Sequence, residues 1–284
     1  GIYCAIVTGF LISALGGSRV QIGGPTGAFV VVVSGIVAEH GISGLFMCTM
    51  MAGVMLVILG VTGTGTAVRF IPRPVVIGFT NGIAVLIAST QIRDFLGLNL
   101  AENPGEFIGR MAAIGRHLDT MSLPAVGLGV LTLLLVLGTN RFVKAVPGTV
   151  VGLVVGTAVA WASQLPVGTV ASQFGAVPSG LPDFEIPTFR PSLMLTLLSP
   201  AVTVCVLGAI ESLMSAVVAD RMSGDRHNPN VELIGQGVAN IVSPMFGGLP
   251  ATGAIARTAT NVRSGARTPV AGMIHALTLL VMLL

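Results

Sequence analysis

The feature that most constrains this chain is a succession of long apolar runs. A membrane-spanning helix needs roughly 17–25 mostly apolar residues, because the hydrocarbon core of a bilayer is about 30 Å thick. The 284 residues contain ten apolar segments, several of them short or interrupted by glycine and proline. The segments lie at about 1–15, 22–38, 43–68, 71–97, 121–140, 144–164, 191–219, 230–245, 251–262 and 267–284.

Composition supports the same class of protein. Hydrophobic residues make up 53% of the chain and charged residues only 9%, whereas a soluble domain carries about 25% charged residues. The three cysteines are dispersed and suggest neither a disulfide framework nor a metal site. The four dispersed histidines form no enzyme constellation, and the net charge of +3 does not indicate nucleic-acid binding. We therefore expect an all-α, multi-pass membrane protein that is not an enzyme.

The connections between the segments predict an orientation. One set of ends carries most of the basic residues. The opposite set of ends, 39–42, 98–120 and 165–190, has mixed charge and most of the acidic residues. Excess Lys and Arg mark cytoplasmic loops, so the basic set of ends is predicted to face the cytoplasm. We expect the protein in the plasma membrane, which is the inner membrane of a bacterium. Both termini lie within apolar runs, so we expect a piece of a longer protein. The basic residues at the predicted cytoplasmic ends are Arg69, Arg73, Arg141, Lys144, Arg221, Arg226, Arg263 and Arg267.

Two glycine- and proline-containing motifs resemble each other. The stretch GGPTGAF at Gly23–Phe29 returns as GGLPATGAI at Gly247–Ile255. Each motif directly introduces a helix within an apolar region. Paired segments interrupted in this way are the best sequence indication of a transporter site built from inverted repeats. A glycine-rich packing contact or a plain turn between spans is the alternative interpretation.

A helix that begins inside the bilayer can bind an anion. Its first N–H groups have no intrahelical partner, and its positive dipole end points into the cavity. Glycine lets the backbone approach a ligand closely, and proline is tolerated in the first turn. Two such helix starts that face each other would form an anion site with few charged side chains.

Two of the charged residues within the predicted spans are candidates for function. Glu211 has Ser215 one turn further along the same helix face. A carboxylate at this depth predicts Na⁺ or proton coupling. The alternative is a purely structural role, with the carboxylate held by helix-end N–H groups or by arginine. Arg257 follows the second motif and can attract the anion, pair with an acidic residue or reach the cytoplasmic surface.

At these residues the chain resembles the SulP (sulfate permease) family of anion transporters. The resemblance covers nearly the whole chain. The matching stretches are GGSRVQIGGPTGAF, IPRPVVIGFTNGIAVLIASTQI, GAIESLMSAVVAD and NVELIGQGVANIVSPMFGGLPATGAIARTATNVRSGARTP.

The resemblance implies fourteen membrane segments in two inverted repeats of seven, the fold of the UraA-like transporters. This chain would then correspond to segments 2–11. Residues 1–68 and 191–284 would form the core domain, 69–165 the gate domain and 166–190 an extracellular loop. Family members form homodimers and carry a cytoplasmic STAS domain, which would lie outside this chain with the first and last three segments.

The resemblance also implies site residues. Glu211 matches the acidic position associated with Na⁺ or proton coupling, and a Na⁺ ion would bind at Glu211, Ser215 and Thr252. Position 256 is alanine where some relatives carry serine, so one hydroxyl contact is lost. The implied substrate-binding residues are Gly24, Pro25, Thr26, Gly27, Ala28, Thr252, Gly253, Ala254, Ile255, Ala256 and Arg257.

Residues and resemblance together predict a secondary active transporter of bicarbonate, sulfate or a dicarboxylate. We expect Na⁺- or proton-coupled symport by an elevator movement of the core against the gate, with no cofactor beyond the coupling ion. An anion exchanger or channel of the same fold and a nucleobase permease are the alternatives. A neutral nucleobase calls for acidic or amide partners, which Arg257 beside two positive helix ends does not favour.

Overall fold

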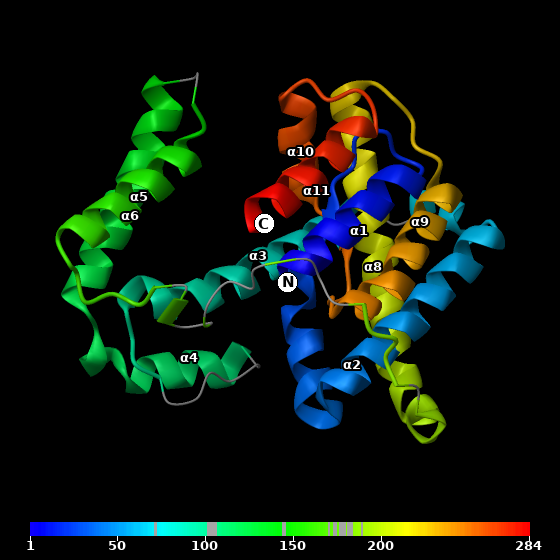
Figure 1. Ribbon diagram of the computed structural model, residues 1–284, viewed down its shortest axis with the longest axis horizontal. Coiled ribbons are helices and arrows are strands. Elements are labelled where there is room, and N and C mark those ends of the chain that lie inside the picture. Colours follow the sequence, from blue (N-terminus) through cyan, green and yellow to red (C-terminus); the bar gives the residue numbers. More distant parts are fainter. Residues whose placement is uncertain are drawn as a thin grey trace. The chain divides into compact units, whose positions relative to one another are not determined.

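The apolar runs become helices in the computed structural model (Figure 1). They divide into two units, the first made of Gly1–Thr80 with Pro178–Leu284 and the second of Asn81–Val177. Their boundaries differ from those predicted for core and gate, and the movement of core against gate stays a prediction. The structure describes the chain apart from residues 71–72, 101–106, 144–145, 170, 173–174, 176–179, 181–183 and 189.

The first unit contains both motifs. Its α-helices are α1 (Ile2–Leu15), α2 (Val30–Val61), α8 (Met194–Ser223), α9 (Pro229–Val242), α10 (Ile255–Arg263) and α11 (Val270–Leu283), and the first turns of α3 (Arg73–Leu96) also belong to it. Short 3-10 helices are η1 (Gly27–Phe29), η2 (Thr64–Phe70), η4 (Pro191–Leu193) and η5 (Ser243–Phe246). Two strands of two residues each are β1 (Gly23–Gly24) and β2 (Thr252–Gly253).

The core of the first unit lies between α2, α8 and α9, which run side by side in Figure 1. The helix α1 packs against α9 and α11, and α10 packs against α8. Apolar side chains of these three helices therefore form a core that also includes Phe29, at the end of the first motif. The core residues include Phe29, Leu45, Cys48, Leu56, Leu197, Val204, Leu213 and Leu233.

Small residues allow α2 and α9 to approach closely. A Cβ atom added to Gly237 would lie 2.6 Å from the carbonyl oxygen of Gly53, and one added to Gly53 would lie 2.7 Å from the carbonyl oxygen of Gly237. Helices in membranes commonly pack through small residues because apolar lipid supplies no hydrophobic drive for helix association. This contact positions α9, which supports the functional site.

Local signals explain where the helices bend and begin. Gly41 interrupts α2 with φ 69° and ψ −177°, and this positive φ favours glycine. The bend separates the two segments expected at 22–38 and 43–68.

The side chain of Asn228 caps α9 by accepting hydrogen bonds from the N–H groups of Asn230 and Val231, and Pro229 occupies the first turn, where its missing N–H costs nothing.

Two helices of the second unit pack through another stripe of small residues. The unit contains the rest of α3 together with α4 (Phe107–Arg116), η3 (Leu118–Thr120), α5 (Leu123–Phe142) and α6 (Gly148–Ala162). Three glycines at four-residue spacing on α6 are buried, and Cβ atoms on them would crowd α5 at Val136 and Thr132. The helix α4 lies where the sequence predicted only a connection.

Several helices have the length and composition of membrane spans. Within the described residues, Gly27–Val61, Leu123–Phe142 and Pro191–Ser223 are long and apolar enough to cross a membrane. Shorter apolar helices cover Ile2–Leu15 and Val270–Leu283, among others.

Of the basic residues used to predict the orientation, Arg141, Arg221, Arg226, Arg263 and Arg267 are exposed. The side chains of Arg69, Arg73 and Lys144 lie outside the described residues.

The contact between α2 and α9 leads to a first prediction. The Gly237→Ala substitution places a methyl group against the backbone of α2, and overpacking of this kind costs about 1–3 kcal/mol. We expect a lower midpoint of thermal unfolding for the purified protein. The control is Gly35→Ala, because a Cβ at Gly35 on α2 meets no atom within 4 Å; equal midpoints for the two variants would contradict the contact.

Candidate functional site

The structure brings the two motifs into direct contact. The strands β1 and β2 pair antiparallel, with Gly23 opposite Gly253 and Gly24 opposite Thr252. The pairing continues beyond the strands, because the N–H of Ala254 donates to the carbonyl of Ile22 at 2.8 Å. Residues more than 220 positions apart thus satisfy each other's backbone groups. Non-helical backbone is tolerated at membrane depth only when such partners exist.

Gly24 fits this position for two reasons. Its φ is 147°, a backbone angle that residues other than glycine rarely adopt. A Cβ at Gly24 would also lie 2.8 Å from Nη1 of Arg257. The glycine therefore admits both the strand pairing and the approach of a guanidinium group.

A helix begins shortly after each strand. Thr26 precedes η1, which leads into α2, and Ala254 precedes α10. Within the described residues, no side chain caps the start of η1 or of α10. The first N–H groups of a helix have no partner inside it, so both starts retain hydrogen-bond donors for a ligand. Gly27 and Ala256 are exposed at these starts.

A buried carboxylate lies beside the first helix start. Glu211 on α8 is 6% exposed, and its Oε2 accepts a hydrogen bond from the hydroxyl of Thr26 at 3.0 Å. Glu211 and Arg257 also attract each other electrostatically. The structure therefore places the predicted coupling residue next to the predicted substrate-binding residues.

Arg257 connects the two motifs. Its Nη2 donates a hydrogen bond to the carbonyl of Pro25, so the side chain of α10 reaches the loop between β1 and η1. Arg257 is half-buried. A guanidinium group has five N–H donors, which leaves further donors for an anion bound at the same place.

The predicted Na⁺ ligands do not all face one another. The hydroxyl of Ser215 donates to Oγ1 of Thr258 at 3.2 Å. The hydroxyl of Thr252 donates to the carbonyl of Gly208 at 3.2 Å. Both hydroxyls therefore have protein partners, and neither is hydrogen-bonded to Glu211 in the described structure.

Ser212 is a site residue that sequence reasoning missed. Its hydroxyl lies 2.6 Å from Oγ1 of Thr252 and accepts a hydrogen bond from the N–H of Gly253 at 3.2 Å. Its carbonyl accepts a hydrogen bond from Nε2 of Gln21 at 3.2 Å. Ser212 directly follows Glu211, but the sequence does not show that β2 lies along this part of α8.

Thr258 connects α10 to the segment just before the first motif in the same way. Its Oγ1 accepts a hydrogen bond from the N–H of Ile22 at 3.0 Å, and Asn261 one turn later donates to the carbonyl of Val20 at 2.9 Å. Polar side chains of α8 and α10 thus form hydrogen bonds with the backbone on both sides of the paired strands β1 and β2, which we call the β1–β2 ribbon. The ribbon is enclosed, whereas the two helix starts beyond it are partly accessible.

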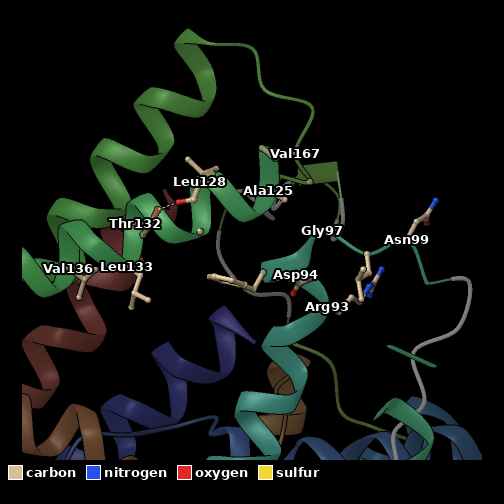
Figure 2. Close-up of a pocket in the computed structure, with 14 residues that line it drawn as sticks. Arg93, Asp94, Gly97, Asn99, Ala125, Leu128, Thr132, Leu133, Val136 and Val167 are labelled. Atoms are coloured by element: carbon tan, nitrogen blue, oxygen red, sulfur yellow. Dashed lines mark hydrogen bonds between the residues drawn. The ribbon is translucent and has the colours of Figure 1, made fainter. Parts of the chain in front are cut away.

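A cavity of about 670 Å³ lies in the second unit (Figure 2). In Figure 2, Arg93 and Asn99 extend away from the apolar wall formed by Leu133 and Val136. The hydroxyl of Thr132 is satisfied by the carbonyl of Leu128 at 2.8 Å. None of the lining residues belongs to either motif, and the mostly apolar wall offers an anion few donors.

The fold and site define a class of protein, a multi-pass membrane protein in which two short paired strands each lead into a helix inside one unit. The family model of the sulfate permease family matches residues 1–284. The chain therefore belongs to the sulfate permease family, a family of membrane transport proteins and not of enzymes.

Relatives and a solved structure agree with this assignment. The chain is 43% identical to the "Putative sulfate transporter YvdB" of Bacillus subtilis over all of this chain and 54% of that protein. It is 32% identical to the bicarbonate transporter BicA of Picosynechococcus over all of this chain and 52% of that protein. The chain thus spans about half the length of the curated relatives it matches.

The solved structure is the transmembrane domain of a cyanobacterial bicarbonate transporter BicA. The match has a TM-score of 0.85 at 32% identity and covers 99% of this chain and 72% of that one. The prediction of an all-α, multi-pass membrane fold is therefore confirmed.

The role of Ser212 is open to a direct test. The Ser212→Ala substitution leaves the hydroxyl of Thr252 and the N–H of Gly253 without this partner, and such a loss in a buried site costs about 1–3 kcal/mol. We expect lower thermal stability for purified Ser212→Ala. The control is Thr203→Val, because Thr203 is an exposed residue of α8 that bonds only to its own helix; a drop of the same size in both variants would contradict a specific role.

Proposed function

We propose that this chain forms the anion-binding part of a secondary active transporter. The observation that supports the proposal most strongly is the pair of uncapped helix starts, at η1 and α10, which the β1–β2 ribbon holds together. Unpartnered N–H groups and the positive helix ends favour a negatively charged ligand. The printed names of the relatives, which are sulfate and bicarbonate transporters, support the same class of substrate.

Arg257 favours an anion over a neutral nucleobase. The guanidinium group lies beside both motifs and adds a full positive charge to the partial charges of the helix ends. Bicarbonate, sulfate and dicarboxylates all have oxygen atoms that accept hydrogen bonds in this geometry. Binding would use the backbone of Gly27, Ala28, Ile255 and Ala256 together with Arg257.

Glu211 is the proposed coupling residue. A carboxylate buried at the first helix start can bind a proton or Na⁺, and either would offset its negative charge beside the anion. Na⁺ would bind Glu211 and nearby carbonyl oxygens. Ser215 and Thr252 would join only if their hydroxyl groups reoriented from their present partners.

The two compact units support alternating access by an elevator movement. Both motifs, Glu211 and Arg257 belong to the first unit, which would carry the anion as the core, while the second unit would contribute to the gate. The expectations of a homodimer, a STAS domain and a bacterial inner membrane remain part of this proposal. A channel of the same fold would show conductance without coupling, and an exchanger would require an anion on the opposite side.

Uptake by the full-length protein tests the coupling. Proteoliposomes would be given radiolabelled bicarbonate, sulfate or succinate with an inward Na⁺ gradient, an inward proton gradient or neither. We expect one anion to accumulate with one gradient. We also expect Glu211→Gln to abolish accumulation above equilibrium, because glutamine cannot bind the coupling proton or Na⁺. Glu39→Gln is the control, because the side chain of Glu39 is 77% exposed. Full gradient-driven uptake by Glu211→Gln would refute the coupling role.

Substitution of Arg257 tests the anion site. Arg257→Gln removes the positive charge, and hydrogen bonds to charged groups contribute about 1.5–3 kcal/mol. We expect the KM for the transported anion to rise about 10- to 100-fold. Arg263→Gln is the control, because Arg263 is exposed in the last turn of the same helix. An unchanged KM for Arg257→Gln would show that the arginine serves architecture only.

A further inference from the structure

A buried polar stripe runs along α9. Glu232, Gln236 and Asn240 follow one another at four-residue spacing, so they share one face of the helix. Glu232 and Gln236 are 0% exposed and Asn240 is 2% exposed. Buried polar groups are costly unless they are hydrogen-bonded, so the partners of these side chains indicate what the stripe does.

The first residue of the stripe holds the segment that leads into β1. We call residues 16–22, between α1 and β1, the first crossover. Oε2 of Glu232 accepts a hydrogen bond from the N–H of Ser18 at 3.0 Å. The N–H of Asn228 donates to the carbonyl of Gly17 at 3.1 Å. The approach requires glycine, because a Cβ at Gly17 would lie 2.0 Å from the carbonyl oxygen of Asn228.

The last residue of the stripe holds the segment that leads into β2. We call residues 247–251, between η5 and β2, the second crossover. Oδ1 of Asn240 accepts a hydrogen bond from the N–H of Ala251 at 2.8 Å, and Nδ2 donates to the carbonyl of Ala251 at 2.8 Å. The side-chain amide therefore binds both backbone groups of one residue, as a neighbouring strand would. Ala251 directly precedes Thr252 of β2.

Hydrogen bonds connect the two ends of the stripe. Nε2 of Gln236 donates to Oε1 of Glu232 at 2.9 Å, and Nδ2 of Asn240 also donates to the carbonyl of Gln236 at 2.8 Å. The eight-residue step from Glu232 to Asn240 corresponds to about 12 Å along the helix axis. A rigid helix thus sets the separation between the two crossovers.

We propose that Glu232 and Asn240 are positioning residues of the anion site. They hold the first and second crossovers on one helix so that β1 and β2 meet in register and both helix starts face the ligand. In the described part of the chain, neither side chain is hydrogen-bonded to the motif residues that would bind the anion. The inference rests on the proposed function, because it assigns these residues a role in anion affinity.

The test compares variants of the full-length protein in two measurements. The substitutions Asn240→Ala and Glu232→Ala each release one crossover, and Asn240→Asp keeps the acceptor for Ala251 but loses the donors while preserving the size of the side chain. Asn230→Ala is the control, because Asn230 lies on the same helix with its side chain beside Gly65. The measurements are the KM for anion uptake and amide hydrogen exchange followed by mass spectrometry.

We expect a local change in exchange and a lower affinity for the anion. Asn240→Ala and Asn240→Asp should speed exchange in the second crossover, residues 247–251, and leave the first crossover, residues 16–22, unchanged, and Glu232→Ala should show the reverse pattern. Loss of these buried hydrogen bonds should raise the KM about tenfold, with Asn230→Ala at the wild-type value.

Two results would overturn the inference. Equal acceleration of exchange in both crossovers would mean that the variants loosen the whole unit. Local acceleration with an unchanged KM would mean that the stripe serves stability and not anion binding. If the wild-type protein takes up no anion, the proposed function fails; the exchange pattern then still decides whether each residue holds its own crossover.

Discussion

The pairing of β1 with β2 is the interaction on which the rest of the site depends. Both strands interrupt apolar regions, where unpaired backbone groups cost several kcal/mol each because lipid offers no hydrogen bonds. Each strand satisfies the other, with Gly24 opposite Thr252. Since neither interruption is stable alone, the fold must bring both to one place, and a helix then begins just beyond each of the paired strands.

Side chains of α8, α9 and α10 complete what the short ribbon cannot satisfy. Ser212 and Thr258 bond to backbone groups at the strands, while Asn240 and Glu232 bond to the segments before them. Apolar packing between α2, α8 and α9 holds the helices that carry these residues. Hydroxyl and amide groups therefore stabilise the interruption, and the N–H groups of the helix starts remain available to a ligand.

Much of the fold was predictable from the sequence, but the partners within the site were less so. Apolar runs long enough to span a bilayer predicted the helices, and the repeated glycine–proline motif predicted two interruptions that belong together. The choice of Ser215 as the partner of Glu211 followed from helical spacing, yet Ser215 bonds to Thr258, while Thr26 bonds to Glu211. Glu232 and Asn240 were overlooked, because a polar residue in a short apolar segment carries no information about its partner. The roles of the site residues in transport stay predictions.

The sequence alone determined the class of protein, because hydrophobicity and segment length reflect the thickness of a bilayer, a property that each segment satisfies independently. It also determined where the helices break, since glycine and proline act on their own backbone. Only the tertiary structure decided which residues meet at those breaks. The register of β1 on β2, the contact of Ser212 with Thr252 and the hold of Asn240 on Ala251 join residues from different elements. Such contacts depend on how the helices pack, which no local pattern specifies.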